Sequence, residues 1–232
     1  MKLLAIETSS DACSAALAID GDIISRFQVA PRRHAEILLP MLDELLLDGG
    51  LSIAQLDLLA MGCGPGAFTG LRIAAGVVQG LAFSADLPVV PVSTLTALAQ
   101  CGWREYGAKK ILAGFDARLR EVYWSACRLN EDNIMTPVAD ERVCLPEHIP
   151  LPEYNGWLGL GSAWHSYADV LSKKLGSCCQ QWHDDHYPHA FDIAVLGEYA
   201  YAQGRAVAAE QVLPVYLRNE VAKKSQPIFE KG

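Results

Sequence analysis

The sequence predicts an α/β protein built from two similar halves. Hydrophobic residues make up 51% of its 232 residues, which is enough for a sizeable core. Apolar strand-like runs alternate with segments of helical spacing. A strand followed by a hairpin partner occurs near residue 2 and again near residue 109. We therefore expect a first lobe over 1–106 and a second over 107–232, with the last helix packing back on the first lobe.

The first half is expected to open with three antiparallel strands at 2–9, 13–20 and 23–30, the last two joined by a turn at Gly21-Asp22. Apolar residues at helical spacing predict a helix over 34–48, ending at Gly49-Gly50. Pro40 either kinks this helix or marks a second helical start. A strand at 56–63, a helix at 71–85, a strand at 87–93 and a helix at 94–106 complete this half.

The second half repeats the pattern with a strand at 109–118 and its hairpin partner at 121–129. The proline-rich segment 135–153 is expected to be loop-like, with room for a short strand. A strand at 155–164, helices at 165–176 and 190–207 and an extended piece at 214–218 follow. The polar tail from Val221 is expected to fray.

Charge and hydropathy exclude several classes of protein. The net charge of −8 argues against independent binding of nucleic acid, which normally requires a basic face. No run of eighteen uncharged apolar residues predicts a membrane span, and the N-terminus lacks the pattern of a secretory signal. We expect a cytoplasmic protein.

The segment Gly62–Arg72, with the sequence GCGPGAFTGLR, resembles a phosphate-binding loop but fails the tests for one. A P-loop needs Lys-Ser or Lys-Thr after its last glycine, and Leu71-Arg72 stand there. A dinucleotide fingerprint is also disfavoured. The acidic residue that binds the ribose should end the second strand of that motif, whereas Asp86 precedes the predicted strand at 87–93. We expect a structural loop that turns the chain tightly, made of Gly64, Pro65, Gly66, Phe68, Thr69 and Gly70.

The two helices at 34–48 and 71–85 are predicted to form a subunit interface. Ile37 and Leu47 fall among acidic residues on the side of the first helix that should face water. Gly76 and Gly80, with Ser84, line one stripe of the second helix and would permit close backbone approach. The predicted interface residues are His34, Ile37, Leu38, Met41, Leu45, Arg72, Gly76, Gln79 and Gly80.

Two groups of residues suggest other chemistry. His183, His186 and His189, beside Asp184 and Asp185, either bind a metal or belong to a loop without ligand; the sequence leaves this open. Asp116 and Glu121 flank a hairpin turn and are either acid/base residues of a small-molecule kinase or ATPase, or a charged turn beside Arg118 and Arg120. We favour the charged turn. Neither G-x-S-x-G nor H-E-x-x-H of hydrolases is present.

Several segments carry a family resemblance: LLAIETSSDACSAAL, PRRHAEILLPML, GCGPGAFTGLRIAAGVVQGLA, VSTLTALAQ, DARLREVYW and PVYLR. They resemble the TsaB (YeaZ) family, over most of the first 125 residues and again near the C-terminus. The resemblance implies an actin/Hsp70/sugar-kinase-like (ASKHA) fold, with two similar lobes and mixed central sheets. It also implies a role in forming threonylcarbamoyladenosine at position 37 of tRNAs that read codons beginning with A.

The resemblance implies that this chain is a non-catalytic subunit without a cofactor or metal. It would support a TsaD-like catalytic subunit and a TsaE-like ATPase, touch tRNA only through the complex, and form a homodimer when alone. The residues agree with this role. The turn Glu7-Thr8-Ser9-Ser10 lacks the glycine of an active phosphate loop, and His34 has Leu38 where a second metal-binding histidine would stand. The alternative remains a small-molecule kinase or ATPase of the same fold.

Overall fold

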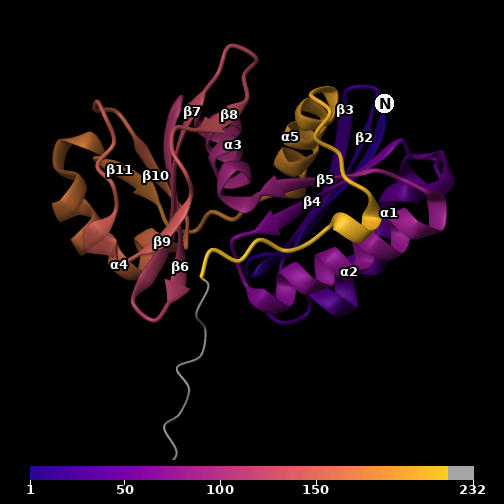
Figure 1. The fold of residues 1–232 in the computed structure, drawn as a ribbon, viewed down its shortest axis with the longest axis horizontal. Helices are drawn as coiled ribbons and strands as arrows, with labels where there is room; N and C mark the ends of the chain where they lie inside the picture. Colours follow the sequence, from indigo (N-terminus) through magenta and orange to yellow (C-terminus); the bar gives the residue numbers. More distant parts are fainter. Residues whose placement is uncertain (219–232) are drawn as a thin grey trace, which may run out of the picture.

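The computed structural model describes residues 1–218, which form two lobes side by side (Figure 1). The first lobe has a five-stranded sheet of order β3-β2-β1-β4-β5. Its strands are β1 (Lys2–Glu7), β2 (Ala12–Ile19), β3 (Asp22–Val29), β4 (Leu58–Gly64) and β5 (Val89–Ser93). The first three strands pair antiparallel, and β1, β4 and β5 are parallel neighbours. The sheet is therefore mixed.

Helices cover both faces of this sheet, so its central strands are apolar on both sides. Alternate residues of β1, such as Leu4 and Ile6, face α1 (His34–Asp48) and α2 (Phe68–Ala85) in one core. The intervening Leu3 and Ala5 belong to a second core with α5 (Ala190–Ala202). A short 3-10 helix, η1 (Ile53–Gln55), precedes β4. Burial on both faces explains why these strands show no alternation of apolar and polar residues.

The second lobe repeats this design. Its main sheet has the order β11-β10-β6-β7-β8, which is the order of the first sheet read from the other end. The strands are β6 (Lys110–Arg118), β7 (Glu121–Leu129), β8 (Met135–Pro137), β10 (Leu158–Leu160) and β11 (Gln181–His183), with β9 (Arg142–Cys144) also pairing with β7. Helices α3 (Thr94–Tyr106) and α4 (Ser162–Leu175) pack on its two faces. Short 3-10 helices are η2 (Pro146–His148), η3 (Gly176–Cys178) and η4 (Ala209–Gln211).

Two helices cross between the lobes. Helix α3 begins directly after β5 of the first lobe and packs on the sheet of the second, whereas α5 follows β11 and packs on the first sheet. The Arg104 guanidinium of α3 donates to both carboxylate oxygens of the buried Asp192 in α5, at 3.1 and 2.9 Å. This charge-assisted pair fixes the two crossing helices to each other.

Most predicted elements are present, with shifted ends. Helix α2 begins at Phe68 instead of 71, so half of the glycine-rich segment is helical, and α5 ends at Ala202 instead of 207. The proline-rich segment 135–153 holds the short strands β8 and β9, and β11 was not predicted. Pro40 lies inside the continuous helix α1. The predicted tail from Val221 lies outside the described residues.

Within residues 1–218, α2 is the helix whose length and composition would suit a membrane span. Its Ala74, Val78 and Ala82 pack into the core of the first lobe. The helix is therefore a layer of the α/β structure.

Candidate functional site

The glycine-rich loop closes on the turn that follows β1. A Cβ on Gly66 would lie 2.6 Å from the Ser9 backbone oxygen, and one on Gly70 would lie 1.9 Å from the Thr8 backbone oxygen. The backbone N–H of Ala67 donates to the Ser9 oxygen at 2.7 Å, and the Thr8 hydroxyl donates to the Gly70 oxygen at 2.8 Å. Glycine is needed here because no side chain fits between the two segments. The loop thus packs directly on the turn at Thr8 and Ser9.

Glu7, at the end of β1, lies fully buried under this contact. One carboxyl oxygen accepts from the Ser9 backbone N–H, while Oε2 has no partner among the described residues. Burial raises the pKa of Glu7 to about 7, and the hydrogen bonds from Ser9 only partly offset this. A carboxyl group in this position cannot reach a substrate from solvent.

The two carboxylates at the β6–β7 hairpin are engaged within the chain. Asp116 accepts from the Arg118 backbone N–H at 2.8 Å and from the Ser166 hydroxyl at 3.2 Å. Glu121 pairs with Arg218, whose Nε lies 3.1 Å from Oε2. This arrangement matches the interpretation of a charged turn.

Of the three histidines of the 183–189 segment, His183 and His186 lie together, with ring centroids 5.4 Å apart, whereas His189 makes separate contacts. The His189 ring accepts from the Phe191 backbone N–H at 2.9 Å, which caps α5, and stacks on Phe27. His183 stacks on Tyr106, and His186 Nε2 lies 2.7 Å from the Tyr106 hydroxyl. No group of three metal-binding side chains occurs among residues 1–218.

Four of the predicted interface residues belong to the interior, so the prediction of a partner-facing role for them is wrong. Leu38, Met41 and Leu45 pack against the first sheet within the core. The His34 ring is also buried, and its Nε2 lies 3.2 Å from the Ala12 backbone oxygen. The error arises because these residues lie on the broad apolar face of α1, which covers the chain's own sheet.

The outer faces of α1 and α2 nevertheless expose several large apolar side chains, and we call this surface the α1–α2 face. It consists of exposed side chains and of two predicted glycines: Leu39, Leu47, Phe68, Phe83, Gly76 and Gly80. Phe83 is 65% exposed and Leu47 is 80% exposed. A Cβ added to Gly76 or Gly80 would meet nothing within 4 Å. Phe83 was not among the predicted interface residues. Of the remaining predicted residues, Ile37 is half-buried and Arg72 is exposed.

An extended segment at residues 212–218, which we call the C-terminal strap, borders this face (Figure 1). The Gln79 amide donates to the Val212 oxygen at 2.9 Å, so Gln79 serves a contact within the chain. The Val215 N–H donates to the Cys63 oxygen at 2.7 Å, and Gly64 leaves room for this crossing. Arg72 lies over the Phe68 ring at 4.0 Å and donates to the Tyr216 hydroxyl at 3.3 Å. The strap thus accounts for Gly64 of the glycine-rich loop, and it was predicted only as an extended piece at 214–218.

Comparison with known proteins assigns the family. A family model described as TsaD, tRNA N6-adenosine threonylcarbamoyltransferase, matches residues 27–225. The chain is 40% identical over 230 residues to the tRNA threonylcarbamoyladenosine biosynthesis protein TsaB of Escherichia coli (strain K12), which covers 98% of this chain and 99% of that protein. The chain belongs to the TsaB (YeaZ) family. The TsaB protein of Haemophilus influenzae is 38% identical over 235 residues, covering 98% of both chains.

Solved structures agree with this assignment to the TsaB family. YeaZ from Pseudomonas aeruginosa superposes with a TM-score of 0.87 at 43% identity, covering 93% of this chain and 99% of that one. A second Pseudomonas aeruginosa structure, described as similar to peptidase YEAZ, gives a TM-score of 0.88, also at 43% identity, over 94% of this chain and 99% of the other. The predicted family and the predicted ASKHA-like α/β fold with two mixed sheets are therefore confirmed.

Proposed function

We propose that this chain is a non-catalytic subunit of the machinery that makes threonylcarbamoyladenosine at position 37 of tRNAs reading codons that begin with A. The names of its TsaB relatives support the pathway. In this proposal it docks through the α1–α2 face onto a TsaD-like catalytic subunit, with a TsaE-like ATPase in the same complex. When alone, it pairs with a second copy through the same face. The first lobe carries the docking helices.

One observation carries the docking proposal: Gly76 and Gly80 stand in the middle of an 18-residue helix and face open space. A mid-helix glycine costs about 1 kcal/mol relative to alanine. No neighbour among residues 1–218 requires either glycine, since a Cβ there would meet nothing within 4 Å. Exposed Phe68 and Phe83 flank them on the same helix. A second helix packed closely against α2 accounts for both the glycines and the exposed rings.

Two features support the absence of catalysis by this chain. The glycine-rich loop fills the turn at Thr8 and Ser9, where an active member of this fold would hold phosphate. The carboxylates of Asp116 and Glu121 already have partners in Ser166 and Arg218. Chemistry is accordingly assigned to the TsaD-like subunit.

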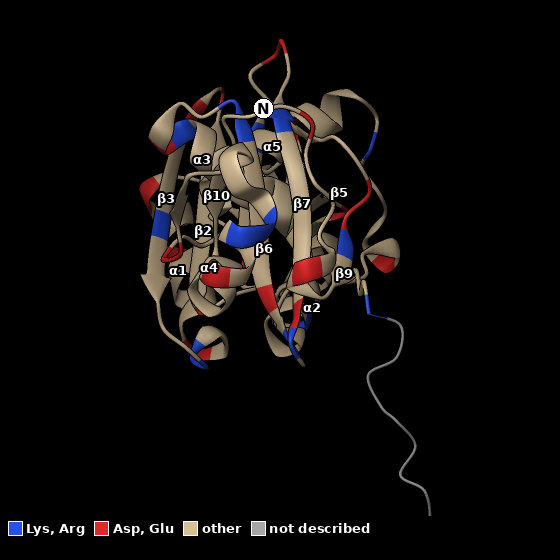
Figure 2. Cartoon of the chain, turned by 90° about the vertical axis from the view of Figure 1, so that its left-hand side faces the viewer, with Lys and Arg blue, Asp and Glu red and all other residues tan. Residues whose placement is uncertain are grey.

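Charge supports contact with tRNA only through the complex. The net charge is −8, and basic and acidic residues are interspersed over the elements seen in Figure 2. A protein that binds RNA alone concentrates lysine and arginine on one face. We place the protein in the cytoplasm, because its bacterial relatives are named for the modification of tRNA, which is found there.

Co-purification with a TsaD-like subunit tests the proposal. Phe83→Glu places a charge on the α1–α2 face and should abolish association, because the charge would be buried against the partner. Leu119→Glu is the matched control, since Leu119 is 72% exposed and lies on the β6–β7 hairpin of the second lobe. Loss of association with both variants, or with neither, would contradict the proposed face.

A further inference from the structure

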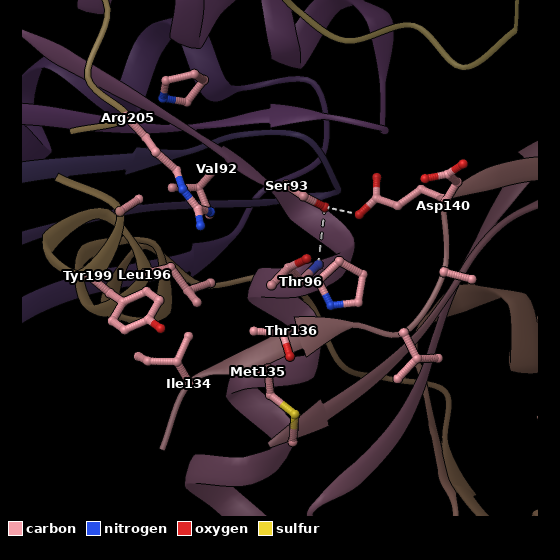
Figure 3. A pocket seen from close by; sticks show the side chains of 16 residues that line it. Val92, Ser93, Thr96, Ile134, Met135, Thr136, Asp140, Leu196, Tyr199 and Arg205 are labelled. Atoms are coloured by element: carbon pink, nitrogen blue, oxygen red, sulfur yellow. Dashed lines mark hydrogen bonds between the residues drawn. The ribbon is translucent and has the colours of Figure 1, made fainter. Parts of the chain in front are cut away.

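A cavity of about 560 Å³ lies where the two lobes meet (Figure 3). The first lobe contributes Val92 and Ser93 at the end of β5, and Leu196 and Tyr199 from α5. The second lobe contributes β8 and the segment 138–141 that follows it. This cavity is separate from the α1–α2 face, because α1 and α2 cover the opposite side of the first sheet from α5.

A fixed carboxylate lies at one side of the cavity. Glu141 accepts a hydrogen bond from the Ser93 hydroxyl, and that hydroxyl accepts from the Thr96 backbone N–H at 3.2 Å. Ser93 is the N-cap of α3, so the carboxylate is held by the start of a helix that crosses between the lobes. Burial raises the pKa of Glu141, and the Ser93 hydrogen bond offsets this only in part. A cation beside Glu141 would relieve this burial cost.

An unpaired guanidinium lies at the other side. Figure 3 shows Arg205 and Tyr199 on one side of the cavity and Ser93 and Asp140 on the other. Within residues 1–218, the Arg205 side chain forms no ion pair and no hydrogen bond, so neither interaction joins it to Glu141. The cavity lining therefore carries two neighbouring carboxylates, Asp140 and Glu141, and the exposed guanidinium of Arg205, and no ion pair among the described residues joins them. Apolar residues lie around the cavity between them, among them Val92, Ile134 and Leu196.

We propose that this cavity binds a small zwitterion that carries an ammonium and a carboxylate, such as a free amino acid. The ammonium donates to Glu141, and the carboxylate accepts the planar fork of N–H groups of Arg205. The aliphatic part of the ligand packs on Val92 and Leu196. Because both lobes contribute walls to the cavity, a bound ligand would contact both lobes and fix the distance between them. This site is independent of the proposed docking function.

Ligand-observed NMR on the full chain tests the site. The probes are glycine, 4-aminobutyrate and 6-aminohexanoate, which vary the distance between the charges, together with butylamine and butyrate, which carry one charge each. We expect saturable binding of at least one amino acid, and binding about tenfold weaker for the singly charged probes. Absence of saturable binding of all three amino acids at millimolar concentration would overturn the proposal.

Variants connect the binding to the two charges. Glu141→Gln and Arg205→Gln should each weaken binding about tenfold, whereas Glu147→Gln and Lys173→Gln, which change exposed charges outside the cavity, should not. Binding should also weaken as the pH falls and Glu141 becomes protonated, and this dependence should be smaller in Glu141→Gln, where Asp140 is the remaining carboxylate of the lining. Unchanged binding in both cavity variants would refute the assignment.

Discussion

Alanine at positions 76 and 80 should make the protein more stable and its docking weaker. Each added methyl group meets nothing within 4 Å in the described part of the chain, so it causes no clash there. The change from glycine to alanine in a helix interior is worth about 1 kcal/mol, so Gly76→Ala and Gly80→Ala together should raise the free energy of unfolding by about 2 kcal/mol. Urea denaturation followed by circular dichroism measures this change directly.

Docking should respond in the opposite direction. If a partner helix approaches α2 at these glycines, Gly76→Leu adds four carbon atoms to a closely packed contact and should weaken binding to a TsaD-like subunit by at least about tenfold. Calorimetric titration of wild type and Gly76→Leu provides the comparison, because both remain folded. The reasoning is refuted if alanine at both positions lowers stability, or if Gly76→Leu binds the partner as wild type does.

Gly70→Ala serves as the contrasting variant on the same helix. Its methyl group would lie 1.9 Å from the Thr8 backbone oxygen, so the two segments must separate. We expect a loss of about 3 kcal/mol in the free energy of unfolding. A stability equal to that of wild type would show that the loop does not close on the turn.

Three further predictions concern buried charge and catalysis. The pKa of Glu7 is raised from 4.5 to about 7, because burial disfavours the charged carboxylate. The stability that the protonated carboxyl contributes is therefore fully present below pH 4.5 and is lost as the pH rises through 7. This contribution is about 3 kcal/mol at most. In urea titrations at several pH values, Glu7→Gln should flatten the change of unfolding free energy between pH 4.5 and 7, whereas the exposed Glu210→Gln should not. Parallel pH profiles for Glu7→Gln and wild type would contradict the burial of a titrating carboxyl. Asp192→Ala removes the carboxylate that pairs with Arg104 and should lower the unfolding free energy by about 3 kcal/mol; a loss below 1 kcal/mol would contradict the role of this pair. Purified protein should hydrolyse no ATP above the rate of Asp116→Ala; faster hydrolysis by wild type would revive the kinase or ATPase alternative.

The sequence predicted the fold well because burial leaves a strong pattern. The apolar strands and the helical spacing of 34–48 depend on neighbours close in the chain, and the repeated hairpin-fed strand indicated two equivalent sheets. The glycine-rich loop was also predicted to be structural, since its residues do not match a phosphate-binding motif.

The candidate site was predicted less well because it depends on contacts distant in sequence. Leu38 and Leu45 are apolar residues of a helix, and only the structure shows that they pack on the chain's own sheet. The role of Gln79 could not be predicted, since its partner Val212 is 133 residues away. The aromatic residue Phe83 carries no local sign of exposure. By contrast, the spacing of Gly76 and Gly80 did identify the face of α2 that is open.

Hydrogen–deuterium exchange on this chain, alone and mixed with a TsaD-like subunit, tests the central claim most directly. We expect the partner to slow exchange in α1, α2 and the C-terminal strap, while α4 and β11 of the second lobe exchange at the same rates as before. Protection confined to the second lobe, or no protection in a complex that forms, would contradict docking through the α1–α2 face.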